Sequence, residues 1–142
     1  MKIHQLSLFA ENKPGHIAAP ARLLAREGID IRSLYLADTQ QYGILRMIVS
    51  DWRKAAAMLE SQGFAVNVTE VLAVEVPDRP GGLADVLEAL DGTGMNIEYM
   101  YAFPMRGDEA ILIFRFADPD AAIARLQTAG INLLASEELL KK

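Results

Sequence analysis

The sequence predicts an α+β protein in which one β-α-β-β-α-β domain occurs twice within 142 residues. The first observation is an internal repeat: Asn-Lys-Pro-Gly at 12–15 returns at 78–81 as Asp-Arg-Pro-Gly, and Gly-Ile-Asp-Ile at 28–31 returns at 94–97 as Gly-Met-Asn-Ile. The second is that strand-like and helix-like apolar patterns follow each other in the same order in both copies. A repeat this long indicates a duplicated domain rather than a short solenoid unit.

In the first copy, apolar residues alternate with polar ones up to Ala10, which is typical of a half-buried strand, and Pro14-Gly15 breaks the pattern. A helix to about Glu27 follows, with its apolar residues on one side and Gly28 at its C-terminus, where a left-handed residue is favoured. The remaining expected elements are strands at 31–37 and 44–49, a helix at 52–62 with Asp51 as its N-cap, and a strand at 64–68.

The second copy repeats these elements. They are a strand at 72–76, a helix at 83–90, strands at 97–103 and 110–116 joined by a hairpin at 106–108, a helix from Asp118-Pro119, a strand at 131–134, and a short helical tail at 137–142. The expected domains are therefore residues 1–70 and 71–142, with almost no linker.

One residue conflicts with this pattern. Pro20 lies inside the expected first helix, where proline cannot donate a backbone hydrogen bond and clashes with the preceding turn. Either the helix begins at Pro20, or its first turn is loose.

This order of elements is that of a ferredoxin-like fold. Each copy of about seventy residues would be marginally stable alone, because small domains bury too little apolar surface. We therefore expect the two domains to lie side by side in an eight-stranded antiparallel sheet, with four helices on one face.

Composition excludes several classes of function. A net charge of −5 argues against a nucleic-acid partner, which requires a basic surface. The chain has no cysteine and two histidines, and it lacks the motifs of Ser-His-Asp, zinc-protease and phosphate-loop enzymes. We therefore expect no enzyme activity, no metal and no cofactor. No apolar run is long enough for a membrane helix and no signal peptide is recognisable, so we expect a cytoplasmic protein.

In both copies the first strand ends in a turn that leads into a helix N-terminus. Unpaired backbone N–H groups and a partial positive charge at such a terminus suit a carboxylate or phosphate. Gly15 and the pair Gly81-Gly82 would allow a ligand to approach the backbone closely. A plain Pro-Gly turn is the simpler interpretation, and the duplication alone could preserve it.

These residues resemble those of ACT domains, which are small modules that sense amino acids. The resemblance rests on 11–15 (Glu-Asn-Lys-Pro-Gly) with 28–31, and on 78–83 (Asp-Arg-Pro-Gly-Gly-Leu) with 94–97. It covers nearly the whole chain, which is similar to the small stand-alone proteins that consist only of two ACT domains.

The resemblance implies ligand sites between two copies, where one copy provides the loop before its first helix and the other the start of its second strand. Site one would then comprise Asn12, Pro14, Gly15, His16, Asn96 and Ile97, and site two Asp78, Gly81, Gly82, Asp30 and Ile31. Two asparagines can donate to and accept from an α-amino acid, whereas two aspartates would repel its carboxylate. We therefore expect site one to be the better site.

Two further points concern specificity and assembly. Serine-sensing ACT domains carry a histidine at the position of Ala10, so serine recognition of that kind is not expected, although His16 could contact a ligand carboxylate or simply be solvated. The sheet face opposite the helices is unusually apolar, which predicts a homodimer that covers it. Its residues are Ile44, Arg46, Ile48, Ile111, Ile113 and Arg115.

The sequence therefore predicts a regulatory protein that binds an amino acid between ACT domains and acts on a metabolic enzyme partner. One alternative is a regulatory small subunit of an amino-acid biosynthetic enzyme of the acetolactate synthase type. The other is an interaction scaffold whose sites bind no ligand.

Overall fold

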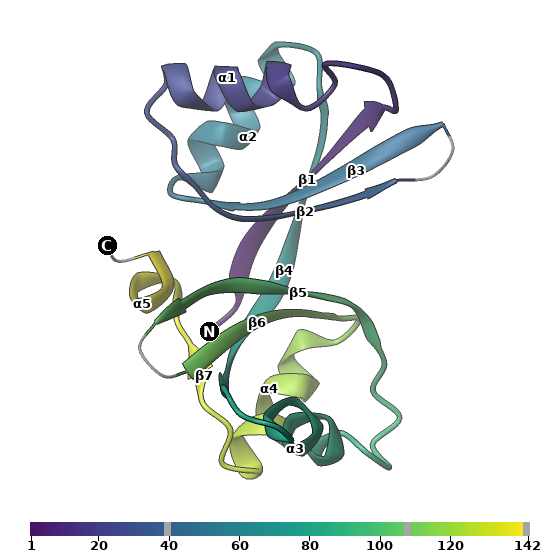
Figure 1. The fold of residues 1–142 in the computed structure, drawn as a ribbon, viewed down its shortest axis with the longest axis vertical. Helices are drawn as coiled ribbons and strands as arrows, with labels where there is room; N and C mark the ends of the chain where they lie inside the picture. Colours follow the sequence, from purple (N-terminus) through teal and green to yellow (C-terminus); the bar gives the residue numbers. More distant parts are fainter. Residues whose placement is uncertain (39–40, 107–108, 141–142) are drawn as a thin grey trace. The chain divides into compact units, whose positions relative to one another are not determined.

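The computed structural model describes residues 1–38, 41–106 and 109–140. It divides into two compact units, and each is described by itself (Figure 1). The N-terminal unit comprises His4–Thr69, and the C-terminal unit comprises Glu70–Lys142 together with Met1–Ile3.

The N-terminal unit has the ferredoxin-like order of elements, β1 (Ile3–Glu11), α1 (Ala18–Arg26), β2 (Ile31–Asp38), β3 (Tyr42–Val49), α2 (Trp52–Ser61) and the first residues of β4 (Ala65–Pro77). Its strands lie in the order β2-β3-β1-β4, so β2 is an edge strand. Leu45 of β3 lies opposite Leu8 of β1 on one side and Leu36 of β2 on the other, both in antiparallel register. Both helices cover the same face of the sheet (Figure 1).

The C-terminal unit repeats this arrangement with the rest of β4, α3 (Gly82–Ala89), β5 (Ile97–Arg106), β6 (Glu109–Phe116), α4 (Pro119–Thr128) and β7 (Leu133–Leu134), followed by the short helix α5 (Ser136–Leu140). Its strand order is β7-β4-β6-β5, with antiparallel pairs. The predicted α+β class with two ferredoxin-like domains is thus confirmed.

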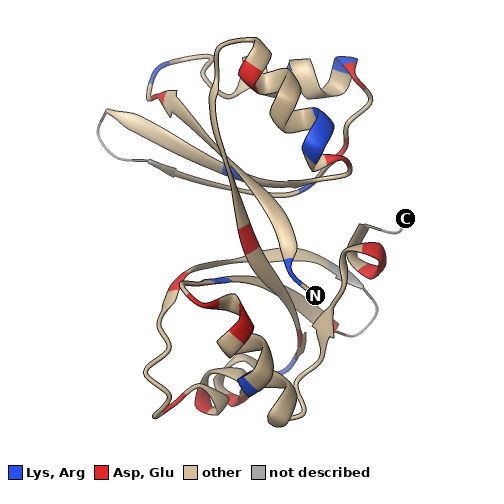
Figure 2. Cartoon of the chain, turned by 180° about the vertical axis from the view of Figure 1, so that it is seen from behind, with Lys and Arg blue, Asp and Glu red and all other residues tan. Residues whose placement is uncertain are grey.

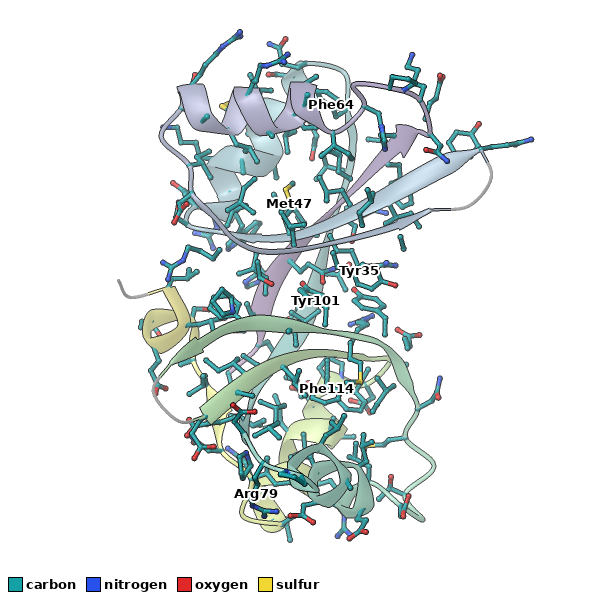
Figure 3. The ribbon with its side chains drawn as sticks, in the orientation of Figure 1. Tyr35, Met47, Phe64, Arg79, Tyr101 and Phe114 are labelled. Carbon is teal, nitrogen blue, oxygen red and sulfur yellow. The ribbon has the colours of Figure 1, made fainter. Side chains whose placement is uncertain are left out.

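Each unit has its own apolar core between sheet and helices. Met47 of β3 points toward α1 and α2, whereas Tyr35 of β2 lies on the opposite face (Figure 3). The buried core is Leu6, Leu8, Leu24, Ile29, Leu45, Met47, Val49, Ala55, Ala56 and Leu59 in the N-terminal unit, and Leu72, Val74, Val76, Val86, Leu90, Phe114, Phe116, Ala122, Leu126 and Leu133 in the C-terminal unit. Burial of these side chains is the main stabilising contribution to each unit.

The strand count differs from the prediction. One strand, β4, covers the region where two strands, 64–68 and 72–76, were expected, because no glycine or proline interrupts the chain between them. The described residues therefore form seven strands rather than eight, and α5 is a fifth helix. The predicted hairpin at 106–108 and tail at 137–142 include residues 107, 108, 141 and 142, which lie outside the described residues.

Pro20 is accommodated at the start of α1. The helix begins at Ala18, so Pro20 occupies its first turn, where a missing N–H removes no internal hydrogen bond. The bond from Ala19 N to Gly15 O is long, at 3.5 Å. In the C-terminal unit, α3 begins at Gly82, and the corresponding bond from Asp85 N to Gly81 O measures 3.0 Å. The first turn at α1 is therefore the looser of the two.

A homodimer was expected because the sheet face opposite the helices is apolar. Ile48, Ile111 and Ile113, which were expected to need a second copy to cover them, are at most 2% exposed within the single chain. The apolar sheet face is therefore no evidence for a dimer at those positions, and the homodimer stays a prediction. In the part of the chain that the structure describes, no helix is long and apolar enough to cross a membrane.

Candidate amino-acid site

The loop before α1 carries Asn12, Pro14, Gly15 and His16 of predicted site one. Asn12 N donates to Gln41 O at 2.9 Å, which holds the loop to the start of β3. Gly15 has φ +84°, a left-handed conformation that favours glycine, although the space around its Cα is open. The backbone of this loop is thus shaped by one glycine and held by one neighbouring strand.

His16 is half-buried, with its ring against β3. Its Nε2 lies 3.6 Å from the position that a Cβ on Gly43 would occupy, and Leu36 Cδ1 lies 3.4 Å from the same point. The imidazole therefore lies beside the backbone of Gly43, which has no side chain to cover it. Its contact with a ligand carboxylate stays a prediction.

The equivalent loop of the C-terminal unit carries Asp78, Gly81 and Gly82 of site two. Gly81 has φ +87°, and a Cβ on Gly82 would lie 2.1 Å from Pro77 O, so the start of α3 approaches the end of β4 very closely. The guanidinium of Arg79 donates to Asp85 Oδ2 at 2.9 Å, across the first turn of α3 (Figure 3). This ion pair has no counterpart at α1, because Ala19 stands at the repeat position of Asp85.

The remaining predicted residues lie at the starts of β2 and β5. Ile31 pairs with Val49 at the end of β3, whereas the Asn12 loop contacts the start of that strand. In the C-terminal unit, likewise, Ile97 pairs with Phe116 at the end of β6, whereas Pro77 pairs with Glu109 at its start. Each unit therefore separates its loop from the start of its second strand, and neither unit can assemble a predicted site from its own residues.

Asn96 lies beside a hollow of about 310 Å³ between the start of β5 and the start of α4. The hollow is lined in part by Thr93, Ala117 and Ala121, and by Asp118, which caps α4 by accepting a hydrogen bond from Ala121 N. Small side chains on α4 leave this space open.

At the equivalent place in the N-terminal unit, side chains form hydrogen bonds with the backbone near the start of β2. Lys54, the repeat equivalent of Ala121, donates to Glu27 O at 3.2 Å, and Ser50 Oγ accepts from Asp30 N at 3.0 Å. The Asp30 carboxylate lies 3.7 Å from the guanidinium Nε of Arg32. The surroundings of Asp30 are thus bonded internally, whereas those of Asn96 are hollow.

The charge is divided unequally between the units. The N-terminal unit carries seven Lys and Arg against six Asp and Glu, whereas the C-terminal unit carries seven against thirteen. Acidic residues are correspondingly frequent over the C-terminal unit in Figure 2. At the edge of the C-terminal unit, a hydrogen bond from Lys2 to Asp120, supported by the charges of Asp120 and Glu70, raises the pKa of the Lys2 ammonium.

Within residues 1–38, 41–106 and 109–140, no group of three or more His, Asp or Glu side chains could hold a metal ion.

Comparison with known proteins identifies the class. The sequence model of the ACT domain pair family matches residues 1–142, so the chain belongs to this family. The family is a pair of regulatory domains, and the match indicates no catalytic family. The resemblance that the turn residues predicted is confirmed. No curated protein matches the chain.

Several solved structures share the fold. Protein BT0572 from Bacteroides thetaiotaomicron is 40% identical, with a TM-score of 0.93 over 100% of this chain and 98% of that chain. The ligand-free regulatory subunit of aspartate kinase from Thermus thermophilus is 20% identical, with a TM-score of 0.63 over 89% and 91% of the two chains. The corresponding subunit from Thermus flavus is 19% identical, with a TM-score of 0.61 over 92% and 94%.

Sequence reasoning missed three residues near the candidate sites. Gly43 was not singled out, although His16 packs on it. Lys54 and Ala121 were not compared, although Lys54 bonds to Glu27 whereas Ala121 lines the hollow beside Asn96. Alignment of the two copies would have shown this lysine-to-alanine difference.

Proposed function

We propose that this protein is a regulatory amino-acid-binding protein whose ligand binds at site one. In this proposal the ligand contacts the loop residues Asn12, Gly15 and His16, and Asn96 with Ile97 completes the site from another copy of the domain. The observation that carries the proposal is the hollow beside Asn96, at a place where Lys54 of the N-terminal unit bonds to Glu27 instead. An amide next to a hollow can donate to a carboxylate and accept from an ammonium.

Site two has less favourable chemistry for the same ligand. Asp30 already lies in a bonded cluster with Arg32 and Ser50, and Asp78 would add a second carboxylate. Two negative charges near a ligand carboxylate raise the free energy of binding unless cations offset them. The Arg79 guanidinium is engaged by Asp85, which limits that compensation.

The ligand would act by changing the balance between two arrangements of the domains. It can shift that balance only by the difference between its affinities for the two arrangements. We propose that a metabolic enzyme in the cytoplasm reads the arrangement. A regulatory subunit of an amino-acid biosynthetic enzyme and a ligand-free scaffold are the competing proposals.

Thermal unfolding in the presence of each of the twenty amino acids at millimolar concentration tests the function. A ligand at 100 times its Kd stabilises the folded protein by about 2.7 kcal/mol. For a chain of this size the midpoint should rise by roughly 5–10 °C. A rise with one amino acid or a related group supports the proposal. No rise with any of the twenty would contradict amino-acid sensing by the isolated chain and would favour the scaffold or the enzyme subunit.

Three single substitutions then assign the site. Asn12→Ala and Asn96→Ala should each weaken binding of the ligand about tenfold or more, because one hydrogen bond to a charged group contributes about 1.5–3 kcal/mol. Asp78→Ala, in the equivalent loop, is the matched control and should leave the Kd within about threefold, a difference below 1 kcal/mol. If Asp78→Ala abolishes binding and Asn12→Ala does not, site two is the functional site.

A further inference from the structure

Both units contain a hollow at the same place in the fold, distinct from the one beside Asn96. It lies between the end of the first strand, the start of the first helix and the start of the last strand, and its volume is about 550 Å³ in each unit. In the N-terminal unit the lining includes Phe9, Ala19 and Phe64, and in the C-terminal unit their repeat equivalents Glu75, Asp85 and Ile131. Since the hollow occurs in both units, it follows from the fold. Only the side chains that line it can therefore indicate whether one of the two hollows binds a ligand.

The hollow of the N-terminal unit has Phe9 and Ala19 where its counterpart has the carboxylates of Glu75 and Asp85, although Glu11 and Lys13 also line it. Phe64 projects toward the N-terminal end of α1 (Figure 3), and Phe9, although it lines the same space, is 39% exposed. In the C-terminal unit the carboxylates of Glu75, Asp85 and Glu88 line the space. Glu75 occupies the position of Phe9 without disturbing the fold. An exposed phenylalanine at this place is therefore not required by the architecture.

The acidic hollow is also crossed by its own polar contacts. Asn132 Nδ2 donates to Glu75 Oε2 at 2.9 Å, and Arg79 donates to Asp85 at the same distance. The equivalents of Asn132 and Asp85 in the N-terminal unit are Ala65 and Ala19, whose methyl groups can make neither contact. The hollow of the N-terminal unit thus has two alanine methyl groups in place of these polar contacts, and two aromatic rings in its wall.

The polar edge of this hollow is the loop of site one. Gly15 and His16 line it together with Lys13, whose ammonium lies 3.4 Å from the Glu11 carboxylate. A space of this volume lies within the range of about 300–1,000 Å³ found for small-molecule sites, which combine apolar walls with a few polar groups. A ligand whose charged end is held by the loop could place an apolar side chain between Phe9 and Phe64.

We propose that this hollow binds the side chain of the ligand and selects an α-amino acid with a large apolar side chain, aromatic or branched aliphatic. The inference rests on the proposed function and adds the ligand class to it. The equivalent hollow in the C-terminal unit, with its carboxylates and internal contacts, rejects the same ligand. Each chain therefore binds one ligand molecule, at the hollow of the N-terminal unit.

The test compares L-phenylalanine with L-alanine by isothermal titration calorimetry on the full chain. Loss of an apolar side chain from a hydrophobic site reduces affinity by about 10–200-fold for each methylene-sized step. We expect the native protein to bind L-phenylalanine at least tenfold more tightly than L-alanine, with one site per chain. Phe9→Glu, which introduces the residue of the equivalent hollow, should reduce that ratio to within about threefold, a difference below 1 kcal/mol.

Two further variants separate selectivity from folding. Phe9→Ala removes one aromatic wall of the hollow without adding a charge, and it should reduce the ratio. Asp85→Ala alters the other hollow and should change neither affinity. Circular dichroism melting verifies that each variant is folded. An unchanged ratio in folded Phe9→Glu and Phe9→Ala overturns the assignment of this hollow.

Failure of the inference can be told apart from failure of the proposed function. If a small or polar amino acid binds tightly and phenylalanine, leucine and isoleucine do not, the protein is a sensor and the apolar hollow is not its selectivity pocket. If none of the twenty binds, the proposed function fails and the inference fails with it.

Discussion

The ammonium of Lys54 on α2 donates a hydrogen bond of 3.2 Å to the backbone carbonyl of Glu27, just after α1. The same ammonium lies 3.8 Å from the Glu27 carboxylate. The repeat equivalents of these two residues are Ala121 and Thr93, which line the hollow beside Asn96. One lysine-to-alanine difference thus accompanies a bonded contact in one unit and a hollow in the other.

Restoring the lysine should close the open hollow. We predict that Ala121→Lys weakens binding of the amino-acid ligand at least tenfold, because the new side chain can reach the carbonyl of Thr93 and occupy the space beside Asn96. Ala124→Lys, at an exposed position on the same helix, is the matched control and should leave the Kd unchanged. Calorimetric titration of both variants measures the effect. Equal affinities for the two lysine variants would show that the hollow is not used.

A methyl group at Gly82 should destabilise the C-terminal unit through overlap with the backbone. Its Cβ would lie 2.1 Å from Pro77 O, so either α3 or the end of β4 must move. Overpacking of this kind costs about 1–3 kcal/mol. We therefore expect Gly82→Ala to lower the melting midpoint by roughly 5–10 °C. Gly43→Ala is the control, because its nearest neighbour is 3.4 Å away, an ordinary contact. A larger loss for Gly43→Ala would contradict this account.

The N-caps of α2 and α4 should contribute similar stability. Asp51 accepts from Lys54 N at 3.2 Å, and Asp118 accepts from Ala121 N at 3.1 Å. Replacing either aspartate by alanine should reduce the free energy of unfolding by about 0.5–2 kcal/mol, because an orphan N–H loses its acceptor. Asparagine at the same positions should retain most of that stability. Urea denaturation of the four variants provides the measurement, and a loss with asparagine as large as with alanine would indicate a role other than capping.

The fold could be predicted because local chemistry and apolar periodicity agree in both copies. Gly28 follows α1 with φ +69°, and Asp51 and Asp118 cap their helices as expected. The continuous strand β4 could not be predicted, because uninterrupted β-branched and apolar residues across Glu70 do not show where one domain ends. Nothing local distinguishes two adjoining strands from one long strand.

The candidate site could be predicted only in its backbone parts. Pro14-Gly15 and Pro80-Gly81 marked the two loops because glycine adopts the left-handed backbone that the turns require. The hollows depend instead on residues distant in sequence, such as Phe9 with Phe64, and on missing side chains, as at Ala121. An absent side chain leaves no motif, and only the comparison of the two copies reveals it. The pairing of Asn12 with Asn96 remains a prediction.

The edge strand β2 gives a different basis for the predicted homodimer. Leu34 and Leu36 on this strand are 55% and 44% exposed, and β2 has no strand neighbour beyond β3 in the described part of the N-terminal unit. An exposed, apolar edge is a site for pairing with another strand, and natural proteins commonly protect such edges with lysine. We predict a dimer at micromolar concentration, and Leu34→Lys should convert it to a monomer of 15.6 kDa in size-exclusion chromatography with light scattering. Ala57→Lys, at an exposed position on α2, adds the same charge away from the edge and should leave the dimer intact. A native protein that is monomeric at tens of micromolar, or a Leu34→Lys variant that remains dimeric, would rule out β2 as the dimer contact.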